Sequence, residues 1–221
     1  MNTMEFWSPV ILSLRVSVLA GIVAFVCAIW AVWRMTIRKF PGLTVIETVF
    51  MLPLVLPPTV VGFLLLVIFG RRSWVGQVFE MFFHMPIVFT WGAAVIAAAV
   101  VAFPLAYQTI KTGFTSIDRD LLAVGRSMGA SEFQLLRFVT LPLARRSLMT
   151  ALILAFTRSL GEFGATLMLA GNIPGRTQTL PTAIYIAVDT NDLNTAWLWA
   201  GLMVLMSFLL LLCTRVAAER E

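Results

Sequence analysis

The sequence predicts an all-helical membrane protein with about five transmembrane helices and one long polar loop. Of its 221 residues, 60% are hydrophobic and only 12% are charged, which is about half the charged share of an average soluble domain. Apolar runs of about 20 residues recur along the chain, and that length crosses the hydrocarbon core of a bilayer. All seven tryptophans lie near the expected ends of these runs, as in the aromatic belts of membrane proteins.

One membrane domain, residues 1–221, is expected to hold five spans, at about residues 10–33, 43–69, 87–110, 148–169 and 197–213. The second span contains Pro57 and Pro58, so its helix should be kinked or broken there. Such a break is either a packing kink or an irregular wall of a pathway. Residues 70–86 are expected to form a loop, and residues 182–188 a helix too short to cross the membrane.

An odd number of spans places the two termini on opposite sides of the membrane, and the basic residues indicate which side is which. The links at 33–43 and 111–147 and the tail after residue 213 contain three, six and two Lys or Arg residues, eleven in all. The links at 70–86 and 170–196 together contain three. Because cytoplasmic loops carry the excess of Lys and Arg, we expect the N-terminus outside and the C-terminus in the cytoplasm.

Residues 115–142 form the longest polar interval and have the pattern of two short helices. Thr115 or Ser116 is expected to cap the first helix, and Gly129 is expected to end it. The apolar faces of the two helices are predicted to consist of Leu121, Leu122, Met128, Phe133, Leu135 and Leu136. A polar helix pair at a membrane surface is either an interfacial linker or a docking site for a soluble partner.

The second helix of this interval is predicted from its capping residues. Ser131 followed by Gln134 has the spacing of a capping box, and the helix should stop before Pro142. Arg126 and Glu132, among other charged residues, keep the remaining surface of the pair polar.

Polar, charged and small residues interrupt the fourth span; they are Arg158, Ser159, Gly161, Glu162, Gly164 and Thr166. Arg158 and Glu162 are four residues apart, so on one helix they would share a face and pair. Each charge costs roughly 2.5–3.5 kcal/mol at mid-membrane, so both should face helices or water. Gly161 and Gly164 allow another backbone to approach closely. The pair is either structural or part of a pore or gate.

The sequence offers no catalytic or metal-binding constellation, and we expect no cofactor. Cys27 and Cys213 lie inside apolar segments as small hydrophobic residues, and His84 has no partner at metal-ligand spacing. The basic residues are dispersed between apolar segments, so no nucleic-acid partner is expected. A Walker A motif is absent, so the chain does not bind ATP by that device.

Three stretches resemble the molybdate permeases of ABC importers: LPLVLPPTVVGFLLL (52–66), FTRSLGEFGAT (156–166) and GNIPGRTQTLPTAIY (171–185). The LGEFGA run is shared with other oxyanion permeases, including those for sulfate, whereas the NIPG run is more typical of molybdate permeases. The chain also resembles this family in its cytoplasmic loop. Gly129 is followed, after nine residues, by Val139-Thr140-Leu141-Pro142, as in the family's pattern. Its Glu-Ala-Ala part is degenerate here, because Ala123, Val124 and Gly125 stand at those positions.

The resemblance, which extends over about residues 10–213, implies the type I ABC importer permease fold and a homodimer in the bacterial plasma (inner) membrane. Two ATP-binding subunits would bind on the cytoplasmic side, and a periplasmic or extracellular molybdate-binding protein would dock on the other. The residues implied to contact the ATP-binding subunit are Arg126, Gly129, Ala130, Ser131, Glu132, Leu141 and Pro142. Tungstate, or sulfate and thiosulfate, are alternative substrates.

Two other classes fit the sequence less well. An ion-coupled secondary transporter would show discontinuous helices in both halves, whereas only the second span carries a proline break. An intramembrane enzyme would need a nucleophile and a base within the bilayer. Ser159 with Glu162 is the nearest such pair, and no histidine lies in a span.

Overall fold

The computed structural model of the chain describes residues 3–37 and 41–219, and the side chains of residues 5–37 and 41–212. Within these residues the regular secondary structure is entirely helical. The helices are α1 (Thr3–Ile37), α2 (Leu43–Val55), α3 (Pro58–Phe69), α4 (Trp74–Phe83), α5 (Trp91–Thr115), α6 (Arg119–Ser127), α7 (Glu132–Leu135), the π-helix η1 (Leu136–Thr140), α8 (Leu141–Leu143), α9 (Arg145–Leu160), α10 (Gly164–Ala170), α11 (Leu180–Asp189) and α12 (Leu193–Glu219).

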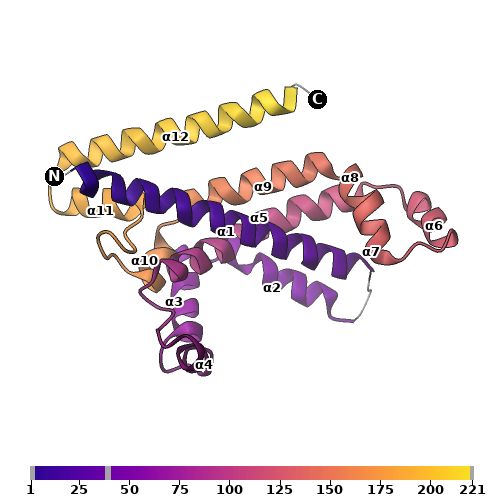
Figure 1. Cartoon of the computed structure of the whole chain (residues 1–221), viewed down its shortest axis with the longest axis horizontal. Helices are drawn as coiled ribbons and strands as arrows, with labels where there is room; N and C mark the ends of the chain where they lie inside the picture. Colours follow the sequence, from indigo (N-terminus) through magenta and orange to yellow (C-terminus); the bar gives the residue numbers. More distant parts are fainter. Residues whose placement is uncertain (1–2, 38–40, 220–221) are drawn as a thin grey trace.

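The centre of the molecule is a bundle of α1, α5 and α9, which run side by side (Figure 1). Small residues fill their contact faces, and Ala24 on α1, Ala98 on α5 and Ala151 on α9 are almost completely buried. A Cβ added at Gly21 of α1 would lie only 3.1 Å from the Cα atom of Phe156 on α9. Small residues therefore let these backbones approach closely, as is usual between helices in membranes.

Among the described residues, three helices are long and apolar enough to cross a membrane: α1 from Glu5 to Ile37, α5, and α12 from Leu193 to Leu212. Two bent helix pairs, Leu43–Val55 with Pro58–Phe69 and Glu132–Leu143 with Arg145–Leu160, bring the total to five if each pair is one span, so the prediction of about five lies at the upper end of this range. Cys27 is a free, exposed thiol on α1. Cys213 lies outside the residues whose side chains the structure describes.

The break predicted in the second span is confirmed. Helix α2 ends at Val55 and α3 begins at Pro58, with a bend of 119° between the two helices. Leu56 and Pro57 between them have extended backbones, with ψ angles of 144° and 137°. A residue before proline favours this conformation, and Pro58 at the first position of α3 is already fixed near helical φ.

The expected loop at 70–86 was only partly right, because it contains the ten-residue helix α4. Ser73 caps this helix: its hydroxyl accepts a hydrogen bond from the backbone N–H of Gly76 at 2.9 Å. The cap and the apolar face that follows it are sufficient to start a helix. His84 terminates α4 with a left-handed backbone, at a φ of 53°. The short helix expected at 182–188 is α11.

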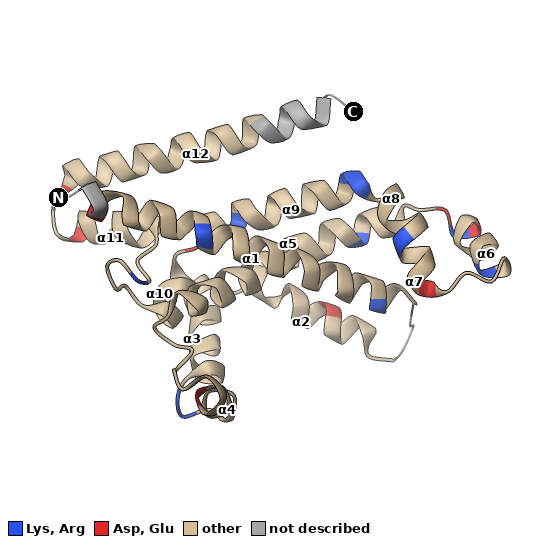
Figure 2. Cartoon of the chain, viewed as in Figure 1, with Lys and Arg blue, Asp and Glu red and all other residues tan. Residues whose placement is uncertain are grey.

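The segment from α6 to α8 (residues 116–144, the α6–α8 loop) lies at the opposite end of the bundle from the start of α1 (Figure 1). Many of the charged residues lie in this loop and at the adjoining start of α9, while the bundle itself carries few (Figure 2). Helix α12 packs on α11 and on the start of α1, and it extends along the bundle (Figure 1). The Nε1–H group of Trp199 on α12 donates a hydrogen bond to the backbone oxygen of Phe6 on α1 at 3.1 Å.

Candidate functional site

The first helix of the α6–α8 loop has well-defined ends. Its N-cap is Asp118, whose carboxylate accepts the backbone N–H of Asp120 at 2.9 Å. The prediction of Thr115 or Ser116 as the cap was wrong, because α5 continues through Thr115 and Ser116 is its C-cap. A carboxylate at this position also meets the positive end of the helix dipole more favourably than a hydroxyl does.

Gly129 ends α6, as predicted. Its φ is +87°, and its N–H donates to the carbonyl of Arg126 at 2.9 Å while the N–H of Ala130 donates to the carbonyl of Gly125 at 3.1 Å. These two bonds form a Schellman motif, which requires a left-handed residue at the position of Gly129. The motif turns the chain sharply from α6 toward α7.

The predicted capping box at the start of α7 is confirmed. The hydroxyl of Ser131 accepts the N–H of Gln134, and the Gln134 side chain accepts the N–H of Ser131 at 2.8 Å. Glu132 binds Arg126 through two hydrogen bonds of 2.7 and 3.2 Å, which joins α6 to α7. The Arg126 guanidinium lowers the pKa of the Glu132 carboxyl, against the smaller opposing effect of burial.

The second helix does not stop before Pro142, contrary to prediction. It continues through the π-helix η1 and through Pro142 to Leu143. The N–H of Leu141 donates to the carbonyl of Leu136, five residues earlier. Proline lacks an N–H and collides with the carbonyl of an ordinary α-turn. The wider π-turn immediately before it lets the helical path continue.

The α6–α8 loop presents apolar side chains that the bundle does not cover. Leu135 and Leu136 are buried, as an apolar inner face requires. Five others are largely exposed: Leu121 (50%), Val124 (59%), Met128 (82%), Phe133 (58%) and Phe138 (69%). A cluster of exposed apolar residues on a rigid, charged segment is typical of a protein–protein contact.

The second candidate site is the break between α9 and α10. Arg158 and Glu162 pair at 2.9 Å, as predicted, with 28% and 1% of their side chains exposed. They do not share one helix face, because α9 ends at Leu160 and Glu162 lies in the break. The second carboxylate oxygen of Glu162 accepts the N–H of Ala165 in the first turn of α10 at 2.8 Å. Both oxygens of this buried acid are therefore engaged.

The fourth span is thus discontinuous, which the sequence did not indicate because the break contains no proline. Thr166 stabilises it by donating its hydroxyl to the carbonyl of Phe163 at 2.8 Å. The hydroxyl oxygen of Ser159 is buried and makes no hydrogen bond within the described residues. Gly161 forms the C-cap of α9 and has open space around its Cα, so the expected close backbone approach there is wrong.

The two broken spans meet at Gly164. A Cβ at Gly164 would lie 3.0 Å from the Cβ of Pro58 and 3.3 Å from the backbone nitrogen of Thr59. One turn further along α3, a Cβ at Gly62 would lie 2.8 Å from the Cα of Ala165. The close approach predicted for Gly164 is confirmed, and its partner is the helix that begins after the proline break.

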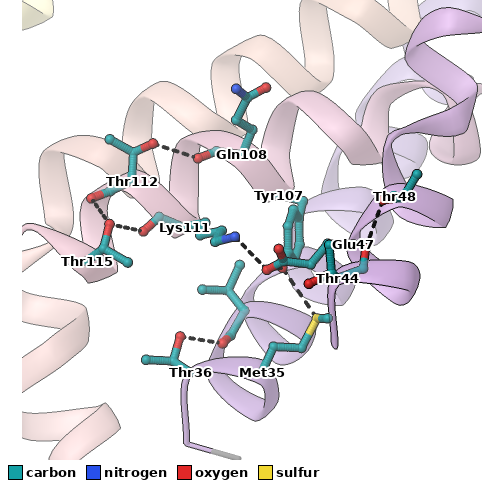
Figure 3. Close-up of polar contacts among 11 residues, drawn as sticks. Met35, Thr36, Thr44, Glu47, Thr48, Tyr107, Gln108, Lys111, Thr112 and Thr115 are labelled. Atoms are coloured by element: carbon teal, nitrogen blue, oxygen red, sulfur yellow. Dashed lines mark hydrogen bonds and ion pairs between the residues drawn. The ribbon is translucent and has the colours of Figure 1, made fainter. Parts of the chain in front are cut away.

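Sequence reasoning missed a polar cluster that joins three helices. Glu47 on α2 accepts hydrogen bonds from Lys111 at 2.5 Å and from the Tyr107 hydroxyl at 2.9 Å, both on α5 (Figure 3). The Tyr107 hydroxyl also lies 3.3 Å from the sulfur of Met35 on α1. The available signal was that Glu47 is the only acidic residue in residues 43–69, since a charge in an apolar span needs a partner.

The described residues contain no group of three His, Cys, Asp or Glu side chains that could hold a metal ion. The polar clusters described above instead connect helices to each other. Apolar helices, with two broken spans among them, carry a projecting, capped loop, which is the architecture of a membrane-embedded helical protein.

Comparison with known proteins identifies the family. The model of the binding-protein-dependent transport system inner membrane component matches residues 20–220. The chain belongs to this family.

Several curated relatives are similar over most of the chain. YvgM of Bacillus subtilis (strain 168), a permease protein assigned by name to a molybdenum transport system, is 55% identical over 94% of this chain and 91% of its own length. The molybdenum transport system permease protein ModB of Escherichia coli (strain K12) is 42% identical over 83% of this chain and 80% of its own length. The sulfate transport system permease protein CysT of Salmonella typhimurium (strain LT2) is 29% identical over 100% of this chain and 82% of its own length.

Solved structures agree on the fold. The MetNI methionine ABC transporter in inward-facing conformations matches with a TM-score of 0.75 and 16% identity, over 100% of this chain and 99% of that one. A bacterial ABC transporter that imports the acidic polysaccharide alginate matches with a TM-score of 0.78 and 14% identity, over 99% of this chain and 80% of that one. The expected ABC importer permease fold is confirmed. In this family the permease is a non-catalytic subunit, which replaces the alternatives of an ion-coupled transporter or an intramembrane enzyme.

Proposed function

We propose that this chain is the membrane-spanning permease subunit of an ATP-driven importer and that its substrate is molybdate. The substrate is inferred from identity: relatives named for molybdenum transport are 55% and 42% identical, whereas a sulfate permease is 29% identical. The resemblance of residues 171–185 to molybdate permeases supports the same choice. Tungstate is the alternative closest in shape and charge, followed by sulfate and thiosulfate.

The observation that carries the coupling role is the exposed apolar surface of the α6–α8 loop. Met128 and Phe133 are 82% and 58% exposed although they lie on a segment whose helices are capped by hydrogen bonds. In the proposed assembly an ATP-binding subunit covers this surface, with Arg126, Gly129, Ala130, Ser131, Glu132, Leu141 and Pro142 forming or shaping the contact. Two copies of the chain and two ATP-binding subunits would make the transporter, with a molybdate-binding protein on the outer face.

The two broken spans are proposed to border the path of the transported substrate. They either move during transport or fix how the helices around this path pack. Pro57 and Pro58 start α3, and Gly164 of α10 packs directly on Pro58. Arg158 and Glu162 hold the start of α10 at a fixed angle to α9 through the ion pair and the bond to Ala165. Because both carboxylate oxygens are engaged, this geometry favours a positioning role over direct contact with a passing anion.

Reconstitution tests the function. The chain in vesicles with its ATP-binding subunit and binding protein should concentrate molybdate when ATP is present, and should not do so without that subunit. Excess tungstate should compete more strongly than excess sulfate. Accumulation against a gradient by the chain alone would refute the proposal, and stronger competition by sulfate would refute the assignment of molybdate.

Gly129 tests the coupling surface separately. In Gly129→Val a β-branched residue must adopt a φ of +87°, which costs about 1–2 kcal/mol and should unwind the junction between α6 and α7. We expect the variant to lose co-purification with the ATP-binding subunit and ATP-driven uptake. Gly129→Asn is the matched control, because asparagine tolerates the left-handed region. Normal coupling in the valine variant would contradict the assignment of this loop.

A further inference from the structure

A cavity of about 800 Å³ lies beside the first half of α1. Its walls come from α1, from the segment before α5 and from the loop between α10 and α11. Most of the lining is apolar, and Leu12, Val18, Met85, Phe89 and Trp91 are examples. None of the lining residues belongs to the α6–α8 loop, to α3 or to α10.

Two arginines from different elements line the same cavity: Arg15 on α1 and Arg176 in the loop after α10. Both are exposed. The four ion pairs found among the described side chains involve Arg71, Lys111, Arg126 and Arg158 instead. Neither guanidinium belongs to one of these four ion pairs, and the acidic residue Glu5 lines an adjoining cavity together with Arg15.

The hydroxyls of the cavity are already engaged by the protein. Thr90 donates to the carbonyl of Ile87 at 2.6 Å and accepts the N–H of Ala93 at 3.2 Å. Thr177 accepts the N–H of Ile173 at 3.0 Å and is almost fully buried. The lining therefore carries two charged groups of donors, the guanidinium groups of Arg15 and Arg176, together with the neutral indole N–H of Trp91, and most of the remaining wall suits hydrocarbon.

The position of Arg15 in the membrane adds a second argument. Arg15 lies inside the membrane-crossing part of α1, eight residues after Trp7, a rise of about 12 Å along the helix. The neighbouring Leu14, Val18 and Leu19 are exposed and face the surroundings of the bundle. An unpaired charge at this depth is unfavourable. Helical side chains lean toward the N-terminus, so the guanidinium reaches back toward the nearer membrane face, where lipid phosphates lie.

We propose that this cavity binds an anionic phospholipid. Its phosphate would sit between Arg15 and Arg176, and its acyl chains would lie along the apolar wall formed by α1, Met85 and Phe89. A free divalent oxyanion fits less well, because most of the wall is apolar and cannot replace its hydration shell. The site is independent of the transported substrate. In the orientation proposed from the basic residues, the lipid would belong to the outer leaflet.

Lipid titration tests the site. The full chain, purified and stripped of lipid in detergent, is titrated with phosphatidylglycerol or with phosphatidylcholine of equal chain length and followed by native mass spectrometry. We expect tighter binding of phosphatidylglycerol. Arg15→Gln and Arg176→Gln should each weaken it about fivefold, and the double variant about 25-fold, given the usual contribution of one basic residue at an anionic surface. Arg72→Gln, an exposed arginine outside the cavity, is the matched control.

Four outcomes would overturn the proposal. One is equal binding of the two lipids by the unmodified chain, and another is an unchanged preference in both single variants. Displacement of the lipid by millimolar sodium molybdate would identify a site for the free oxyanion. A change of oligomeric state in the double variant would identify a second copy of the chain as the occupant. Unaltered thermal unfolding of each single variant shows that a loss of binding is local.

Discussion

At the residue scale, Glu162 decides how α9 and α10 are joined. Its carboxylate is the most buried charge of the described ion pairs, with 1% of the side chain exposed, and it binds Arg158 and the N–H of Ala165. A buried acid is tolerated only when such partners replace its hydration. The other described pairs are more exposed: Arg126 and Glu132 retain 48% and 38% of their side-chain exposure.

Replacing Glu162 tests this difference. Glu162→Gln keeps an oxygen for the N–H of Ala165 but leaves the Arg158 charge unpaired in a largely buried setting. The free energy of unfolding should fall by about 3 kcal/mol, at the lower end for breaking a buried pair, as measured by denaturation in detergent. The double variant Arg158→Met with Glu162→Gln removes both charges and should recover part of the loss. Equal losses in the single and double variants would contradict this account.

The Arg126–Glu132 pair predicts a pH dependence. Arg126 lowers the pKa of Glu132 in the folded chain, so the pair stabilises the fold above the ordinary glutamate value of about 4.3. That contribution is lost as the pH falls through the lowered folded pKa. Because both partners are exposed, it should be only about 0.5 kcal/mol. The stability difference between the unmodified chain and Glu132→Gln should be present at pH 7 and absent below both pKa values. A difference that does not vary with pH would exclude this origin.

At the element scale, glycine positions determine how closely the broken spans meet. A side chain at Gly62 would place its Cβ 2.7 Å from the Cβ of Met168 and 2.8 Å from the Cα of Ala165. Real Cβ atoms do not approach backbone atoms so closely, so α3 and α10 would have to separate. Gly161, only three residues before Gly164, has open space instead.

Alanine at Gly62 and alanine at Gly161 should therefore have different effects on stability. Gly62→Ala should lower the free energy of unfolding by about 1–3 kcal/mol, as overpacking usually does, and should reduce transport if the α3–α10 contact shapes the pathway. Gly161→Ala should change stability by less than about 1 kcal/mol. Thermal unfolding in detergent and uptake in vesicles measure the two effects. A loss for Gly161→Ala equal to that for Gly62→Ala would show that the packing is not the cause.

At the scale of the whole molecule, the charges divide between the two ends of the bundle. Figure 2 shows many of them in the α6–α8 loop and the adjoining start of α9, with others at the turn between α3 and α4. In sequence the difference is eleven Lys and Arg residues in the links expected inside against three in those expected outside. We propose on this basis that the α6–α8 loop is cytoplasmic and that α1 begins outside.

Cysteine labelling tests this orientation. A cysteine introduced at Arg72, in a chain whose Cys27 and Cys213 are replaced by serine, should react with a membrane-impermeant maleimide in intact cells. A cysteine at Ser127, exposed at the end of α6, should react only after the membrane is opened. The reverse pattern would invert the topology and would also place the proposed lipid site in the other leaflet.

Local features were predictable because neighbouring residues determine them. Gly129 specifies a helix end, and Ser131 with Gln134 specifies a helix start, through hydrogen bonds within a few residues. Pro57 and Pro58 break the second span whatever its tertiary surroundings are. The number of spans likewise follows from apolar length alone. The cap at Asp118 and helix α4 were missed because alternative caps or a loop were equally compatible with the local sequence.

The sequence by itself left other features open, either because no residue pattern specifies them or because they depend on partners far away in the chain. The path through Pro142 needs a π-turn that no residue pattern announces, and the break at Glu162 is stabilised by its fit between Arg158 and α10. The meeting of Glu47 with Lys111 joins residues 64 positions apart. Composition and local patterns thus determined that the chain is a helical membrane protein with three to five apolar spans and a capped polar loop. Only the tertiary structure decided that Glu47 pairs with Lys111 and where the broken helices touch, because those contacts arise when distant helices pack.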